Sequence, residues 1–254
     1  MVDIKAIYTL WLRELKRFSR SKSRIISSLS MPLLFLVALG LGFSNINVAG
    51  APEGASYIAF LMPGIICMTL MTSSVMSGIS VLWDREFGFL KEIMVAPVDR
   101  LSIALGRMAG GVTTSMIQGL LILLLSLLMG VGLPSIVTFL MVLLVMTLIS
   151  TTFVGLGLIF SSIMKDMQGF SSIMSFIIMP LLFLSGAFYP IDNLPLIVRL
   201  LSYADPLTYG VDALRGLLIG FTTFPLIMSV GLIALTSIIM IVIGTALFNK
   251  SDNA

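Results

Sequence analysis

Apolar residues follow one another along this chain in stretches long enough to cross a membrane. A hydrocarbon core of about 30 Å needs about 20 helical residues, and five uncharged stretches reach that length: 25–52, 54–83, 108–164, 167–191 and 216–249. The stretch 108–164 is long enough for two crossings, and Gly130, Gly132 and Pro134 favour a turn at its middle. The pattern therefore predicts six spans, at about 25–43, 57–83, 108–129, 136–163, 170–188 and 226–248.

Basic residues divide unevenly between the two sides that six spans define. All but two of the 15 lysines and arginines fall on the side of the termini, including the group from Lys5 to Arg24 and the loop residues Arg85, Lys91, Arg100 and Arg107. Only Arg199 and Arg215 fall on the other side. Because basic loops stay in the cytoplasm, we expect both termini to be cytoplasmic. A cleaved signal peptide is the alternative at the N-terminus, but the apolar run from Ile25 is too long for one.

Composition agrees with a membrane protein and excludes several kinds of chemistry. Hydrophobic residues make up 58% of the 254 residues, charged ones 11%, and mean hydropathy is +1.11. There is no histidine and a single cysteine, and no Gly–Lys step that a P-loop requires. We therefore expect one transmembrane domain over 1–254, with no catalytic residue, metal site or cofactor of its own. The proposed spans contain no Asp, Glu, Lys or Arg, which argues against an ion-coupled transporter.

The segment before the first span has the pattern of an amphipathic helix. Its apolar residues recur at spacings of three and four, and its basic residues occupy the remaining face. Such a helix lies in the cytoplasmic membrane interface, with Trp11 at headgroup depth and Arg13, Lys16 and Arg17 toward anionic lipid. Docking on a partner protein is an alternative that does not exclude the first.

The loop after the second span reads DREFGFLKEIMVAPVDR, from Asp84 to Arg100. Phe87, Leu90 and Ile93 recur at helical spacing, and Pro97 ends the helix that they predict. A short helix with a charged face suits the groove of a soluble partner. The alternative is a charged loop that merely ends two spans. A Gly106–Gly110 pair that enters the third span favours close helix packing, within one chain or between two.

The segment between Tyr189 and Pro225 is apolar but interrupted by prolines and glycines. Two pieces, 194–201 and 207–220, are too short or too charged to span, and we expect them to be re-entrant or interfacial on the external side. Arg199, Asp205, Asp212 and Arg215 are expected to pair with one another or to face the outer headgroups. The segment is either an external gate or a structural cap; the candidate gate residues are Tyr189, Pro190, Asp205, Pro206, Asp212 and Arg215.

Four stretches of this sequence resemble the ABC type-2 permease family, the membrane subunits of drug, polysaccharide and lipo-oligosaccharide exporters. They are DREFGFLKEIMVAPVDR (84–100), ALGRMAGG (104–111), GAFYPIDNLP (186–195) and DPLTYGVDALRGLLIG (205–220). The resemblance implies an all-α integral membrane fold: six transmembrane helices, an N-terminal interfacial helix, a cytoplasmic coupling helix and short external re-entrant helices. It also implies the plasma membrane of a prokaryotic cell.

By the same resemblance, a coupling helix from Glu86 to Met94 contacts a separate ATPase subunit. The contact residues would be Glu86, Phe87, Gly88, Phe89, Leu90, Lys91 and Glu92. Phe87 and Leu90 would fill the groove, Glu86 and Glu92 would meet basic residues on its rim, and Gly88 would permit close approach. Two copies of the ATPase, which would hold ATP and Mg, and a second permease copy are the expected partners, besides membrane lipid and without nucleic acid.

The function that follows is outward movement of an amphipathic or lipid-linked substrate (a drug, glycan or lipid), driven by that ATPase. No buried charge in the spans would coordinate a free ion. The alternatives are a membrane scaffold or assembly protein that transports nothing, and an ion-coupled transporter.

Overall fold

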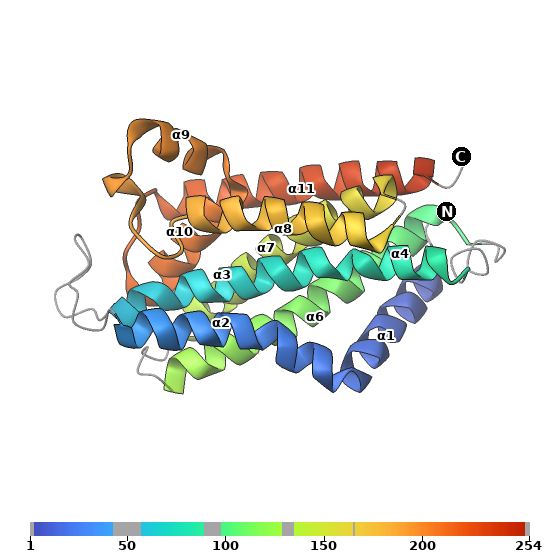
Figure 1. Ribbon diagram of the computed structural model, residues 1–254, viewed down its shortest axis with the longest axis horizontal. Coiled ribbons are helices and arrows are strands. Elements are labelled where there is room, and N and C mark those ends of the chain that lie inside the picture. The colour runs from blue at the N-terminus through green and yellow to red at the C-terminus, as the bar shows by residue number, and fades with distance from the viewer. Residues whose placement is uncertain (1–2, 43–56, 89–97, 129–134, 165, 252–254) are drawn as a thin grey trace.

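The computed structural model describes residues 3–42, 57–88, 98–128, 135–164 and 166–251 (Figure 1). All regular elements within these ranges are helices. They are α1 (Ile4–Arg20), α2 (Lys22–Gly42), α3 (Tyr57–Ser77), α4 (Ile79–Glu86), α6 (Arg100–Leu128), α7 (Ile136–Ile163), α8 (Met167–Leu184), the 3₁₀ turn η1 (Ile191–Asn193), α9 (Leu196–Ala204), α10 (Pro206–Ile219) and α11 (Leu226–Ser251).

Five helical segments in this part of the chain are long and apolar enough to cross a membrane. They are Tyr57–Glu86, Arg100–Leu127, Ile136–Ile163, Met167–Leu184 and Leu226–Lys250. A sixth crossing is reached if α1 and α2 are counted together, although the two helices meet at 69°. The all-helical fold with five to six spans confirms the prediction from hydropathy. The helices extend beyond the apolar windows, so that Asp84 and Arg107, which the sequence placed in the loop, lie within α4 and α6.

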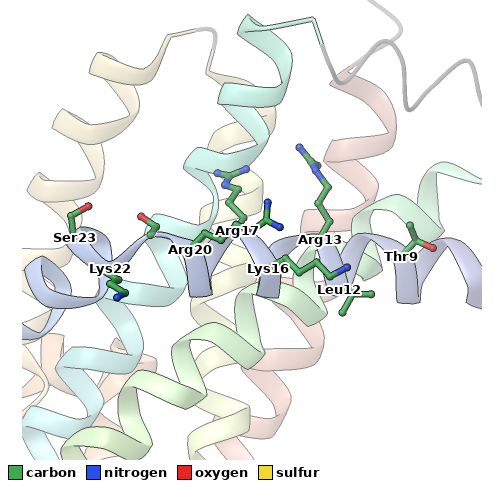
Figure 2. A pocket seen from close by; sticks show the side chains of 9 residues that line it. Thr9, Leu12, Arg13, Lys16, Arg17, Arg20, Lys22 and Ser23 are labelled. Atoms are coloured by element: carbon green, nitrogen blue, oxygen red, sulfur yellow. The ribbon is translucent and has the colours of Figure 1, made fainter.

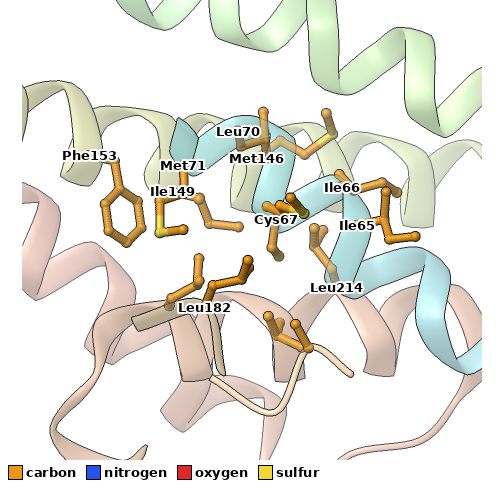
Figure 3. Close-up of a cluster of buried hydrophobic side chains, with 14 of the residues drawn as sticks. Ile65, Ile66, Cys67, Leu70, Met71, Met146, Ile149, Phe153, Leu182 and Leu214 are labelled. Atoms are coloured by element: carbon orange, nitrogen blue, oxygen red, sulfur yellow. The ribbon is translucent and has the colours of Figure 1, made fainter. Parts of the chain in front are cut away.

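The helix α3 is the centre of the bundle. It packs on α2, α6, α7 and α10, and its side chains from Phe60 to Met62 are fully buried. Figure 3 shows Cys67, Leu70 and Met71 of α3 surrounded by side chains of α7, α8 and α10. By contrast, α8 and α11 present large apolar side chains outward, such as Phe176 and Ile227, which are 80% and 85% exposed. These outer faces suit lipid or another membrane-embedded surface.

Glycines allow three close approaches between segments of the chain. A Cβ built on Gly64 would lie 2.3 Å from the carbonyl oxygen of Ala187, and one on Gly78 would lie 2.5 Å from that of Gly157. Gly78 is also the residue at which α3 gives way to α4. The pair Gly106 and Gly110 faces α1: a Cβ at Gly110 would lie 2.6 Å from Cβ of Glu14. This pair therefore packs a helix of its own chain.

The two ends of the bundle differ, and we name them for what they carry. The basic end holds α1, the start of α2, the end of α4, the start of α6 and the end of α11, so that both described ends of the chain lie there (Figure 1). The α9–α10 end lies opposite and holds η1, α9 and α10 (Figure 1). Helices of 9 and 14 residues are too short to span a membrane.

Candidate functional site

A buried carboxylate at the basic end joins three helices. Asp84 of α4 accepts two hydrogen bonds from Arg13 of α1, at 2.9 and 2.8 Å from Nη1 and Nη2. Nη2 of Arg107, on α6, lies 2.8 Å from Oδ2 of the same carboxylate, and Nη1 of Arg17 lies 4.0 Å from its Oδ1. Removing one partner of such a buried pair would leave the other charge uncompensated, which is strongly destabilising. We call Asp84, Arg13, Arg17, Arg107 and the neighbouring Glu14 the charge cluster.

The helix α1 is fixed to α6 along its length. Leu10 and Phe18 are its buried residues, and Trp11 Nε1 donates to Thr113 Oγ1 of α6 at 3.0 Å. Arg17 stacks on Trp83 of α4, with its guanidinium carbon 5.1 Å from the ring centroid. The predicted amphipathic helix is therefore present, with one face docked on its own chain and exposed residues such as Ile4 on the other.

The basic side chains of α1 also border an open groove of about 940 Å³ that runs to the start of α2 (Figure 2). Its lining residues are Thr9, Leu12, Arg13, Lys16, Arg17, Arg20, Ser21, Lys22 and Ser23. Five of these nine side chains are cationic and none is acidic. Arg13 and Arg17 thus serve both the charge cluster and this groove, whereas Lys16 is exposed in the groove.

The predicted contact loop begins at the end of α4. Glu86 is the last residue of α4 and is exposed, and Phe87 beyond it is 80% exposed. Gly88 adopts φ +75°, a left-handed conformation that ends a right-handed helix. The predicted helix therefore does not continue from α4 through Gly88, and the rest of it, as far as Met94, stays a prediction. Phe89, Leu90, Lys91 and Glu92 lie outside the described residues.

Both flanks of this loop are tied to neighbouring helix ends. Arg85 Nη1 donates to the carbonyl oxygen of Met164 at the end of α7, at 3.2 Å. Arg100 Nη1 donates to the carbonyl oxygen of Asn249 in the last turn of α11, at 3.1 Å. Cations at helix C-termini are favoured by the unpaired carbonyls there. The segments that enter and leave the loop are thus bonded to the helices around them.

A cavity of about 420 Å³ lies inward of the charge cluster, between α1, α2, α3–α4 and α6. Its polar lining comprises Glu14, Arg17, Ser27, Ser28, Thr72, Ser73, Ser77, Ser80, Arg107, Thr114 and Gln118. Its apolar lining comprises Phe18, Met31, Pro32, Met68, Met76, Ile79 and Trp83, besides Gly111. A volume of this size suits a small molecule or part of a larger one.

At the α9–α10 end, the three charged residues of the predicted gate, Asp205, Asp212 and Arg215, are buried and bonded to backbone groups. Asp212 accepts from the backbone amides of Thr223 and Phe224, at 2.6 and 3.4 Å, and from Ser229 Oγ at 2.8 Å. Arg215 donates to the carbonyl oxygen of Gly186 at 2.9 Å and lies 3.8 Å over the ring of Phe60. The expectation that these charges pair or face headgroups is wrong for Asp212 and Arg215, because α10 carries them into the protein core.

Asp205 and the uncharged gate residues begin or border short helices. Asp205 caps α10 by accepting from Leu207 N at 2.8 Å, and Pro206 occupies the first turn, where its missing amide costs nothing. Burial raises the pKa of the Asp205 carboxyl to about 8. Pro190 precedes η1, and Tyr189 donates its hydroxyl to the carbonyl oxygen of Phe183 at the end of α8. These contacts fix the turn between α8 and α9.

Comparison with known proteins agrees with this architecture. The family described as ABC-2 type transporter matches residues 5–219, which include the charge cluster, the loop and α10. The chain belongs to the ABC-2 type transporter family.

Two of the following three relatives have transport permease in their names. The inner membrane transport permease YadH of Escherichia coli K12 is 28% identical over 232 residues, covering 90% of this chain and 88% of its own. The putative transport permease ycf38 of Cyanophora paradoxa is 30% identical over 217 residues, covering 84% of this chain and 73% of its own. Nodulation protein J of Rhizobium leguminosarum bv. trifolii is 28% identical over 228 residues, covering 89% and 86%.

Proposed function

We propose that this permease is the membrane subunit of an ATP-driven exporter that moves an amphipathic or lipid-linked substrate outward. The family supports a transport role for the chain itself. The cavity beside the charge cluster has polar and apolar walls together, as a substrate with both characters would need. Outward direction and substrate class are proposals that rest on the resemblance and on this lining.

Energy enters, in this proposal, through the loop between α4 and α6. The observation that carries it is the position of Asp84, two residues before the exposed Glu86 and bonded to Arg13 of α1 and Arg107 of α6. A displacement of the loop by a bound partner would move α4, and the ion pairs would transmit the movement to α1 and α6. Phe87 is an exposed aromatic anchor suited to such a partner's groove.

The partner we propose is a separate ATPase subunit, in two copies that hold ATP and Mg, with two copies of the permease. The outward apolar faces of α8 and α11 leave membrane-embedded surface for a second permease copy. We propose that the basic end is cytoplasmic, since lysine and arginine collect there. The membrane would be the plasma membrane of a prokaryotic cell, with both termini in the cytoplasm.

At the opposite end, the proposed gate is confined to η1 and α9. The bonds of Asp212 and Arg215 hold α10 to the core and favour a structural role for it. The helix α9 instead exposes Leu196, Ile197, Leu200 and Leu201, an apolar face that suits a segment lying in the outer interface.

The test is copurification of the permease with its ATPase in lipid nanodiscs, for the wild type and for Glu86→Arg. We expect the charge reversal to dissociate the complex or to abolish substrate-stimulated ATP hydrolysis, because Glu86 would face basic residues of the partner. The matched control is Asp192→Arg, an equal charge reversal at an exposed site of the α9–α10 end, which should leave the complex intact.

Two other functions are tested by the same experiment. If no ATPase binds the wild type, or if Glu86→Arg changes nothing, a scaffold or assembly protein becomes the better interpretation. An ion-coupled transporter needs an ionisable residue free to bind its ion. Asp84, the buried carboxylate of the basic end, is not free in this sense, because its guanidinium partners already neutralise it.

A further inference from the structure

The cavity of about 420 Å³ contains cationic groups that the protein leaves partly unsatisfied. Arg107 is 5% exposed, and its Nε and Nη1 have no hydrogen-bond partner among the described residues. Nη2 of Arg17 is buried and equally without one. Both residues line the cavity. A buried guanidinium with open donors is costly, so the cavity is arranged for an acceptor that the chain itself does not supply.

The net charge of the cluster indicates which kind of hydrogen-bond acceptor the cavity would bind. The charge cluster holds three arginines against two carboxylates, Asp84 and Glu14. Asp84 is engaged by Arg13 and forms an ion pair with Nη2 of Arg107, whereas Nε and Nη1 of Arg107 have no hydrogen-bond partner among the described residues. One positive charge therefore remains without a counter-charge in the cluster. An anion is the complement, and the fork of guanidinium donors matches the oxygens of a phosphate.

A second group, Glu14, limits the kind of anion that the cavity can bind. Glu14 also lines the cavity, its Oε1 has no hydrogen-bond partner among the described residues, and Arg17 Nη1 is 3.8 Å from it. A bare phosphate would be repelled by this carboxylate. A phosphodiester whose head group carries a hydroxyl satisfies both sides, because its phosphate accepts from Arg107 and Arg17 while the hydroxyl donates to Glu14.

The apolar walls indicate how the rest of the ligand is accommodated. Phe18, Met31, Met68, Met76 and Trp83 line the same cavity. The helix α2, which forms one wall, carries exposed apolar residues such as Ile26 and Leu34 on its outer side. Acyl chains that begin in the cavity can therefore continue along α2 into the bilayer.

We propose that the cavity between α1, α2, α3–α4 and α6 binds the head group of an anionic membrane lipid, a phosphodiester with a hydroxylated substituent, through Arg107, Arg17 and Glu14. The site lies within one permease copy. Two sources share this chemistry: a resident bilayer phospholipid that stays bound, and a lipid-linked cargo that ATP turnover removes. The second source rests on the proposed transport function, whereas binding itself does not.

The two tryptophans of the chain make the binding measurable. Trp83 lines the cavity, and Trp11→Phe leaves it as the single tryptophan. The variant is placed in phosphatidylcholine nanodiscs that contain a minor fraction of either brominated phosphatidylglycerol or brominated phosphatidylcholine, and quenching of Trp83 by bromine is recorded. We expect the phosphatidylglycerol probe to quench several-fold more strongly, and equal quenching by the two probes would overturn the proposal.

Three variants in that background separate specific binding from surface attraction and from misfolding. Arg107→Gln should weaken phosphatidylglycerol quenching by about tenfold in apparent affinity, the loss of one charge-assisted interaction. Thr114→Leu keeps every charge and fills part of the cavity, so it should weaken quenching without disturbing Asp84. Lys5→Gln removes an exposed cation of α1 outside the cavity and should change nothing. If Lys5→Gln weakens phosphatidylglycerol quenching as much as Arg107→Gln does, or if Thr114→Leu retains wild-type quenching, the cavity is not the binding site.

ATP turnover in the complex with the ATPase distinguishes the two sources. Relief of quenching during turnover identifies the bound phosphodiester as a mobile cargo, and constant quenching identifies a resident lipid; both support the binding site. Failure of the ATPase to bind would count against the proposed function alone, since the quenching measurement needs only the permease.

Discussion

Buried charges at the two ends of this permease are satisfied in different ways. At the basic end, Asp84 is bonded to the side chains of Arg13 and Arg107, which come from two other helices. At the α9–α10 end, Asp212 accepts from two backbone amides and Arg215 donates to a backbone carbonyl. A side chain can exchange one guanidinium for another as helices shift, whereas backbone groups stay where the fold places them.

This difference indicates which end of the permease is suited to movement. The charge cluster sits beside a cavity, contains one surplus cation, and lies two residues from an exposed loop. The charges of α10 balance, because Asp212, with three bonded donors, is matched by one cation, Arg215, which donates to Gly186 and lies over Phe60. The first arrangement fits a coupling region, and the second fits a fixed cap.

Removal of Asp84 is the strongest test of the difference between the two ends. Asp84→Ala leaves Arg107 and Arg13 without their counter-charge, and we expect a loss of about 3–5 kcal/mol in stability. The measurement is the midpoint of thermal unfolding of the purified permease, with the exposed Asp192→Ala as control. Asp84→Leu combined with Arg107→Leu should recover much of the loss, because an apolar pair replaces a pair of charges. An unchanged midpoint in Asp84→Ala would show that the cluster contributes nothing to the fold.

At the other end, Arg215→Leu should cost about 2–3 kcal/mol, because it removes a charge-assisted bond to Gly186 and a cation–π contact with Phe60. No second substitution should restore the stability of Arg215→Leu, because the acceptor that it leaves unpaired is the backbone carbonyl of Gly186. The combination with Asp212→Leu is therefore expected to be additive or worse. A clear rescue by that double variant would mean that the two ends do not differ as described.

Hydropathy was sufficient to predict the helices, and the structure explains why it did not predict the charge cluster. A long uncharged stretch must become a buried helix, so the spans could be placed from the sequence alone. Asp84 and Arg107 flank those stretches, and a hydropathy window treats such residues as the ends of spans. The helices α4 and α6 nevertheless continue through them, and the two side chains form an ion pair. The signal in the sequence was one acidic and one basic residue at facing ends of consecutive spans.

Three further residues show what the sequence pattern alone could not predict. Gly106 and Gly110 predicted close packing correctly, but only the structure identifies α1 as the helix that packs there. Arg215 was expected to meet a carboxylate or a headgroup, because sequence shows a charge and not the carbonyl that will lie beside it. The ATPase-contact residues 89–92 lie outside the described residues, so their role stays a prediction.

The docking of α1 offers a sharper test of the basic end. Gly110→Ala places a Cβ 2.6 Å from Cβ of Glu14, so α1 must shift, and we expect a loss of about 2 kcal/mol. The matched control is Gly231→Ala in α11, where the new methyl group meets nothing within 4 Å and should be neutral or slightly stabilising. Thermal unfolding measures the stability, and Trp11 emission reports whether α1 has moved. Equal behaviour of the two variants would show that α1 is loosely held.

Over the single unit from about pH 6 to pH 7, the effect expected for Asp205, at the start of α10, is smaller than those above. Its pKa of about 8, raised by burial from the usual value near 3.8, means that the folded protein holds a proton that the unfolded chain has released. Stability should therefore fall as pH rises between these two values and level off above about 8, by at most about 1.4 kcal/mol for each pH unit. Asp205→Asn keeps an acceptor for the amide of Leu207 and cannot ionise, so its unfolding midpoint should change less between about pH 6 and pH 7 than that of the wild type. Parallel midpoints in the two proteins would show that Asp205 is ionised in the folded state, and the α9–α10 end would then also carry a buried charge with an unbonded oxygen, as the basic end does.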